Sequence, residues 1–249
     1  MSSERPTLPT PAAGDIFATT HWTVVLAAGR RSTAQSDHAL EELCRAYWYP
    51  LYAYVRRHGH SKEDAEDLAQ GFFAAFLKRN YLEDVRSEKG RFRAFLLAAL
   101  KHYLANEYDR ASRQKRGGGL APLSLDWQDA DTRYQIDPPD QLSPDKLYDR
   151  AWAVTLLEQV INRLRAECAA DGKAAVFEQL KSFLTAGKRD IPYAEAAARA
   201  GLTEGAARVA VHRLRKRYRE LLRAEIAQTL SNPADLEEEM RALFRAFAD

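Results

Sequence analysis

The most distinctive chemistry in the chain is a run of cationic side chains between Glu204 and Arg223. Seven arginines or lysines stand there against two glutamates. Apolar residues recur among them every three or four positions, which predicts a helix with one buried face. Such a helix suits DNA binding, because arginine can hydrogen-bond guanine edges in the major groove and any cation can pair with a phosphate. The candidate DNA-binding residues are Glu204, Arg208, His212, Arg213, Arg215 and Lys216.

The residues just before this helix would position it. Ala197 and Gly201 stand four apart, where a small side chain allows close packing and a glycine can take the positive φ of a tight turn. Thr203 is a good N-cap for the second helix. These features predict a helix-turn-helix; the alternative is a solvated amphipathic helix in a bundle. The inward face would consist of Ala207, Val211, Leu214, Tyr218 and Leu221.

A second basic block, from Arg86 to Arg116, carries nine cations against three acidic residues. Aromatic residues alternate with these cations, which suits unstacked bases, because rings stack on bases while cations follow phosphates. Tyr108, between Asn106 and Arg110, is the candidate for an exposed stacking platform. The spacing predicts a helix over 91–113 that buries Phe92, Phe95, Ala99 and Tyr103.

Two further helices are expected before this block. Apolar spacing predicts the first from about Asp37 to Arg57, kinked at Pro50 and ended by Gly59. Ser61 would cap the second, with an acidic residue three positions later as in a capping box. The helical spacing of the nearby aromatic residues indicates core and packing surface for Tyr47, Trp48, Tyr49, Tyr52 and Tyr54.

An acidic segment separates the two halves of the chain. Seven aspartates and four prolines lie between Ala121 and Asp149, against two cations. This composition predicts a flexible acidic linker over residues 119–150. A second helical domain is expected beyond it, and then a C-terminal helix within 231–249, capped by Asn232. The apolar face of that last helix would consist of Leu236, Met240, Leu243, Phe244 and Phe247.

The remaining composition argues against several classes of protein. Cys44 and Cys168 cannot make a disulfide framework and have no metal-ligand spacing, so we expect a reducing cytoplasm and no metal. The first residues lack the apolar run of a signal peptide, and no apolar stretch is long enough to cross a bilayer. No nucleophile motif or nucleotide fingerprint is present, so neither enzymatic activity nor a cofactor is expected.

In this order, the parts of the chain resemble an extracytoplasmic-function (ECF) sigma factor, a bacterial subunit that directs RNA polymerase to promoters. The resemblance rests on DAEDLAQGFFAAFL (Asp64 to Leu77) followed by the basic aromatic helix, the acidic linker and the helix-turn-helix. It covers roughly Ala39 to Leu230. It implies an all-α protein of two small helical domains in the cytoplasm, with core RNA polymerase and promoter DNA as partners. An anti-sigma factor or another regulator is a further partner to consider.

The resemblance also implies roles for individual residues. Asp64, Asp67 and Gln70 would contact the clamp helices of the largest polymerase subunit. The helix that starts at Glu204 would read the minus-thirty-five element. Gly71 departs from the family, which more often has an acid there. The minus-ten element would be read from the helix that carries Lys101, His102, Asn106, Tyr108, Arg110 and Arg113.

The expected domain organisation follows from the same parts. It consists of an N-terminal extension (1–34), a region-two-like domain (35–118), the acidic linker (119–150), a region-four-like domain (151–230) and a C-terminal extension (231–249). Two other interpretations stay open, namely a self-sufficient helix-turn-helix repressor or activator and a helical adaptor without a DNA role. The lack of a heptad seam for dimerisation counts against the first, and the two basic blocks count against the second.

The C-terminal helix also has two interpretations. It could brace the second domain by burying its apolar face. Alternatively, it could cover a DNA-binding or polymerase-binding face and restrain the factor until a partner displaces it.

Overall fold

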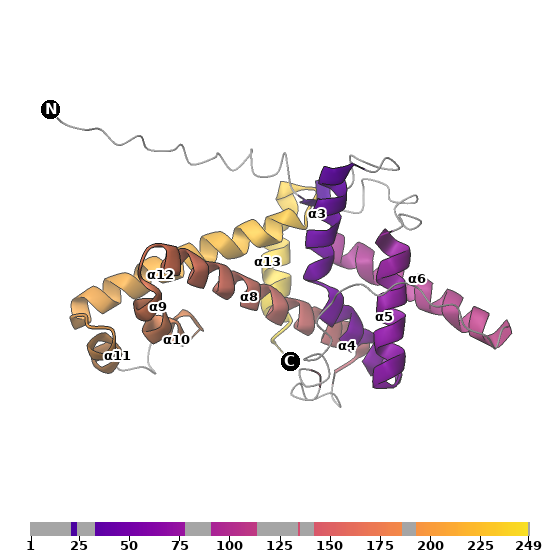
Figure 1. The fold of residues 1–249 in the computed structure, drawn as a ribbon, viewed down its shortest axis with the longest axis horizontal. Helices are drawn as coiled ribbons and strands as arrows, with labels where there is room; N and C mark the ends of the chain where they lie inside the picture. The colour runs from indigo at the N-terminus through magenta and orange to yellow at the C-terminus, as the bar shows by residue number, and fades with distance from the viewer. Residues whose placement is uncertain are drawn as a thin grey trace. The chain divides into compact units, whose positions relative to one another are not determined.

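The computed structural model describes residues 21–23, 33–77, 91–113, 134, 142–185 and 193–248. These residues are helical almost throughout and contain no strand, apart from an isolated antiparallel bridge between Arg91 and Leu230 (Figure 1). The predicted all-α fold is therefore confirmed for this part of the chain. None of these helices is both long enough and apolar enough to cross a membrane. Outside the described residues lie the N-terminal leader, the glycine-rich loop after Arg113, most of the expected acidic linker, and Ile191–Pro192.

The chain divides into two compact units. The first comprises residues 1–151 and 226–249, and the second comprises residues 152–225. Helices α8 (Pro144–Ala170) and α12 (Glu204–Gln228) each contribute residues to both units.

The first unit begins with two helices where the sequence predicts one. Helix α3 (Ala34–Arg45) ends before a turn at Ala46 and Tyr47, and α4 (Trp48–Arg57) follows. Pro50 is the third residue of α4, where its missing N–H costs no helical hydrogen bond. In one continuous helix the proline ring would collide with the carbonyl four residues earlier, so the chain turns at that point.

The residues that were predicted to end α4 and to cap α5 have the expected conformations. Gly59 takes a φ of 92° just after His58, the C-cap residue of α4. Ser61 precedes α5 (Lys62–Leu77), and its Oγ accepts a hydrogen bond from the Asp64 N–H at 3.1 Å and donates one to Asp64 Oδ2 at 2.8 Å. Both carboxylates in the first turn of α5, Glu63 and Asp64, lie where the helix dipole favours negative charge.

Aromatic side chains form the core of the first unit. Helix α6 (Phe92–Arg113) buries Phe92, Phe95, Ala99 and Tyr103 as predicted. The ring of Trp22 packs edge-on to Phe92 with 5.0 Å between centroids. Cys44 of α3 is also buried, and burial raises the pKa of its thiol. The expected packing role of the tyrosines is confirmed by the burial of Tyr47, Tyr49, Tyr52 and Tyr54.

Helices α5 and α6 approach each other closely at Gly71. A Cβ atom at this position would lie 2.4 Å from the hydroxyl oxygen of Tyr103, well inside van der Waals contact. The Tyr103 ring is buried and packs edge-on to Phe72 at 5.7 Å. Gly71 therefore provides the space that the tyrosine of α6 occupies.

The C-terminal residues belong to the first unit. The Phe92 N–H donates to the Thr229 carbonyl at 2.9 Å, and Leu230 is fully buried. Asn232 caps a 3₁₀ turn, η1 (Pro233–Asp235), by accepting from the Ala234 N–H at 3.0 Å. Helix α13 (Leu236–Arg245) follows.

The predicted apolar face of α13 is wrong in part. Leu243 is fully buried, but Phe244 is 61% exposed and Phe247 is 41% exposed. The other fully buried residue of α13 is Glu239, whose carboxylate lies between Arg91 and Arg93. The helix is therefore rotated away from the face that its hydrophobic residues alone would favour.

The second unit contains the rest of α8 together with α9 (Ala174–Leu180), α10 (Ser182–Thr185), α11 (Tyr193–Arg199) and most of α12. Helix α8 begins earlier than expected, since residues 144–150 of the anticipated linker are helical. Cys168 near its end is buried. One core cluster joins α9, α10, α11 and α12 through Leu180, Phe183, Ala196, Ala197, Ala207 and Val211.

Candidate functional site

The turn between α11 and α12 has the geometry that its sequence predicts. Gly201 takes a φ of 67°, and the Leu202 N–H donates to the Ala197 carbonyl at 2.9 Å, which closes the end of α11. Thr203 Oγ1 accepts from the Ala206 N–H at 3.2 Å and caps α12. The expected inward residues Ala207, Val211, Tyr218 and Leu221 are buried, and Leu214 is half-buried.

The opposite face of α12 presents cations to solvent. His212, Arg213 and Lys216 are exposed, and within the described ranges none of them has a hydrogen-bond or ion-pair partner. The charges of Arg213 and Lys216 are therefore available to a polyanion. An exposed apolar residue that the sequence analysis did not single out, Val209, lies on the same face with 51% of its surface accessible.

Arg208 is exposed but already engaged. Its Nη2 and Nε atoms donate to Glu204 Oε1 at 2.6 and 3.1 Å. Its guanidinium also lies 4.7 Å from the centre of the Tyr193 ring. These two contacts orient the arginine side chain at the start of α12, but both partners of the ion pair are exposed, so solvent screens it.

Two other arginines of α12 hold the second unit together. Arg215 is half-buried and donates through Nε and Nη2 to the Phe183 carbonyl at 2.9 and 2.7 Å, so it does not lie on the open cationic face. Arg217 makes two hydrogen bonds of 2.8 Å to the carboxylate of Glu167 on α8. The hydrogen bonds from Arg217 lower the pKa of Glu167, although partial burial opposes the shift.

The first unit has a hollow of about 880 Å³ between α4, α5 and α6. Asp64 and Asp67 of α5 line one part of it, and Lys101 and Tyr108 of α6 line another. Two sets of candidate residues, proposed separately from the sequence, thus border one depression. Tyr108 is 77% exposed. Other lining residues that the sequence analysis did not single out as site residues are Tyr54, His58, His60 and Glu107.

The remaining candidates of this unit are on the same helices but do not line the hollow. His102, Asn106 and Arg110 are exposed on α6, and Arg110 pairs with Glu107 at 2.7 Å. Gln70 is half-buried one turn beyond Asp67. The side chain of Arg113 is outside the described residues.

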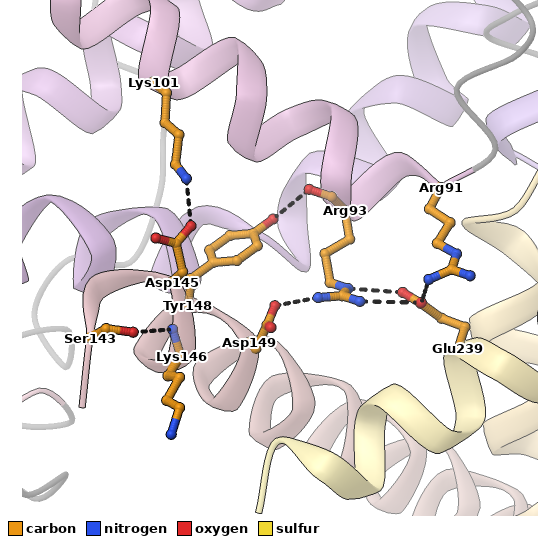
Figure 2. A network of polar contacts seen from close by, with 9 residues as sticks. All are labelled: Arg91, Arg93, Lys101, Ser143, Asp145, Lys146, Tyr148, Asp149 and Glu239. Atoms are coloured by element: carbon orange, nitrogen blue, oxygen red, sulfur yellow. Dashed lines mark hydrogen bonds and ion pairs between the residues drawn. The ribbon is translucent and has the colours of Figure 1, made fainter. Parts of the chain in front are cut away.

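Lys101 has an internal counter-ion. Its Nζ donates to Asp145 Oδ1 at the start of α8, and this hydrogen bond raises the pKa of the lysine (Figure 2). The ammonium group also lies 5.7 Å from the centre of the Tyr54 ring. Both members of the pair are about half exposed, so solvent screens the attraction and a phosphate can compete for the lysine.

Two arginines at the start of α6, Arg91 just before it and Arg93 within it, are bound more firmly. Arg93 donates from Nε to Glu239 Oε1 at 2.9 Å and from Nη1 to Asp149 (Figure 2). Burial opposes the charge on Arg93, but these carboxylates outweigh it and raise the pKa of the arginine. Arg91 pairs with Glu238 at 2.6 Å and with Glu239 at 3.5 Å.

The second basic block therefore has two parts with different uses. Arg91 and Arg93 hold α13 and the start of α8 by internal ion pairs. Further along α6, the side chains of Lys101 and Arg110 are exposed to solvent. Among the described cations of this block, Lys101 and Arg110 are therefore more accessible to a nucleic acid than Arg91 and Arg93.

The described part of the chain holds no group of three or more histidine, cysteine or acidic side chains placed to bind a metal ion. Apart from the hollow, it has an apolar groove of about 490 Å³ in the second unit. Its lining includes Leu164 and Cys168 of α8, Phe177 of α9 and Leu214 of α12.

Comparison with protein families gives a match in the first unit. Residues 43–114 match the family model described as Sigma-70 region 2. The match spans α4, α5 and α6, and so includes every helix that borders the hollow. It supports a sigma-70 family factor, and thereby a role in promoter recognition and RNA polymerase binding. The comparisons with curated proteins and with solved structures found no match.

Proposed function

We propose that this chain, whose residues 43–114 match the sigma-70 region 2 domain, is an ECF-type sigma subunit that directs core RNA polymerase to promoters. The observation that carries the proposal is the hollow of the matched domain. There, carboxylates suited to a cationic protein partner stand beside a lysine and an exposed tyrosine suited to nucleic acid. Such a subunit acts in the cytoplasm and needs no cofactor.

The polymerase contact is assigned to α5. Asp67 is exposed and, within the described ranges, makes no hydrogen bond or ion pair. Asp64 is engaged in the helix cap with Ser61, so its contribution is smaller. Gln70 lies one turn further along the same helix and adds an amide to the contact.

The minus-ten contact is assigned to the exposed half of α6. Tyr108 is 77% exposed and has no ring contact in the described structure, so its ring is accessible to an unpaired base. His102 and Asn106 offer hydrogen-bonding groups on the same helix, and Lys101, Arg110 and Arg113 offer positive charge for phosphates.

The minus-thirty-five contact is assigned to α12. Its N-terminal turn would enter the major groove, with Arg208 held in place by Glu204. His212, Arg213 and Lys216 would contact base edges or phosphates, since all three are exposed. Arg215 has a structural role instead, because its guanidinium donates hydrogen bonds to the Phe183 carbonyl.

Co-elution with core RNA polymerase tests the proposal. The double variant Asp67→Ala, Gln70→Ala should lose co-elution while keeping the wild-type melting temperature. Glu63→Ala is the matched control, because it removes an exposed carboxylate from the first turn of the same helix. Strong sequence-specific DNA binding by the chain without core polymerase would favour a self-sufficient repressor or activator instead.

A second measurement concerns Tyr108. Transcription from a promoter should fall with Tyr108→Ala and persist with Tyr108→Phe, because the phenylalanine ring still stacks on a base. If both variants transcribed as the wild type does, Tyr108 would have no part in the minus-ten contact.

A further inference from the structure

Val209 is an exposed apolar side chain on a helix face that otherwise carries small and polar residues. Just over half of its surface (51%) is accessible to solvent. His212 and Arg213 follow it by three and four positions, so they project from the same side of α12. Neither has a hydrogen-bond or ion-pair partner among the described residues.

The helical turn of α12 before Val209 carries small side chains. Gly205, four positions earlier, lacks a side chain, and a Cβ atom added there would have no neighbour within 4 Å. Ala206 is also small and exposed. A helix that begins with such residues can approach another surface closely, which brings the Val209 side chain to the deepest part of the contact.

Single exposed aliphatic residues are common and need no special explanation. Val209 differs because two exposed cations, Arg213 and Lys216, follow it on the same face. When Arg213 and Lys216 pair with phosphates, the face between them and the helix start is pressed against the base edges. The valine is then buried against the base edges. It has no polar atom that could replace the hydrogen bonds to water that those edges lose.

The major groove displays one apolar group, the 5-methyl of thymine. The other base edges present hydrogen-bond donors and acceptors, which a valine would leave unsatisfied. We propose that Val209 is a specificity-determining residue that contacts the 5-methyl group of a thymine in the DNA read by α12. This inference rests on the proposed function, because it requires α12 to lie in the major groove.

Uracil substitution tests the contact directly. Promoter DNA is first selected from a randomised upstream element, using holoenzyme made from the full chain and core polymerase. Each thymine of the selected element is then replaced by uracil, which lacks the methyl group and keeps the hydrogen-bonding edge. Binding of each duplex is measured for wild-type, Val209→Ala and Arg213→Ala holoenzymes.

At one thymine, uracil should weaken wild-type binding by about fourfold, the effect of one buried methyl-sized group. The same replacement should have no effect on Val209→Ala, which already lacks the contact. Arg213→Ala should bind all duplexes more weakly and keep the fourfold effect of uracil. Because Val209 and Arg213 are both exposed, the two variants should keep the wild-type melting temperature.

The inference is overturned if no thymine shows a uracil effect, or if the effect persists in Val209→Ala. Either result leaves the proposed function standing, provided that a sequence is selected and Arg213→Ala weakens its binding. If the holoenzyme selects no upstream sequence and Arg213→Ala binds as the wild type does, the assignment of α12 to DNA fails instead.

Discussion

Glu239 and Arg93 form a two-point ion pair between α13 and the start of α6. Nε donates to Oε1 at 2.9 Å and Nη2 donates to Oε2 at 3.2 Å. The Glu239 side chain has no accessible surface, and Arg93 retains 13%. Asp149 of α8 binds the same guanidinium, so three segments that are distant in the chain meet at one arginine.

Removing Glu239 should therefore destabilise the protein. Glu239→Ala leaves buried positive charge with one carboxylate fewer, and should lower the free energy of unfolding by about 3 kcal/mol. Denaturant unfolding measures the loss. Glu238→Ala is the matched control, because this neighbour also pairs with Arg91 but is 56% exposed; it should cost less than about 1 kcal/mol. Similar losses of unfolding free energy in the two variants would show that burial of Glu239 does not strengthen its ion pair.

Truncation after Leu230 removes η1 and α13 together. Because α13 supplies the carboxylate of Glu239 and the buried side chain of Leu243, the shortened chain should melt at a lower temperature. This outcome would identify the C-terminal extension as a brace, on the first unit rather than the second. Unchanged melting together with increased polymerase binding would support the restraint hypothesis instead.

The close approach of α5 and α6 predicts a compensating pair of substitutions. Gly71→Ala should cost about 1–3 kcal/mol, because its Cβ would collide with the Tyr103 hydroxyl. Tyr103→Phe removes that oxygen and leaves the ring carbon 3.5 Å from the new Cβ, an ordinary contact. The double variant should thus lose less stability than the two single losses summed. Additive losses in a double-mutant cycle would show that the hydroxyl is not the obstacle.

The arginines of α12 should separate into two groups. Arg213→Ala should weaken binding to all promoter sequences, keep the wild-type melting temperature, and reduce the slope of log affinity against log salt by about 1. Arg215→Ala should instead lower the melting temperature, since it removes both hydrogen bonds to the Phe183 carbonyl. The two measurements are binding in a salt series and thermal unfolding. Identical profiles would mean that α12 contacts DNA through a different face.

The pair between Glu167 and Arg217 predicts a dependence of stability on pH. Since Arg217 lowers the pKa of Glu167 below its ordinary value of 4.5, the ionised carboxylate stabilises the folded state above that value. This contribution should disappear as the pH falls through the lowered pKa. Comparing unfolding of the wild type and Glu167→Gln between pH 6 and pH 2 isolates the effect. A constant difference across that range would contradict it.

Signals that act within a few residues were sufficient to predict much of this structure. Ser61, Thr203 and Asn232 cap the segments assigned to them, and Gly201 has the positive φ that its turn requires. Each of these features depends on backbone atoms close in sequence, so the sequence itself contains the necessary information.

Features that depend on distant partners could not be predicted in this way. The periodicity of α13 favours burial of Phe244, but the structure buries Glu239, whose partner Arg93 is 146 positions away. Arg215 has the spacing of an outward residue, but a carbonyl 32 positions earlier binds it. The hollow could not be predicted as one site either, because three helices contribute to it.

The two buried cysteines offer independent reporters of local opening. Cys44 lies in the first unit and Cys168 in the second, and burial raises the pKa of each thiol. Because thiolates react with alkylating reagents and buried thiols do not, each cysteine is labelled when its surroundings open. Cys168 borders the apolar groove, so its labelling should also slow when a ligand fills that groove. Mass spectrometry of the two labelled peptides would then follow the opening of each unit separately, without any substitution in the chain.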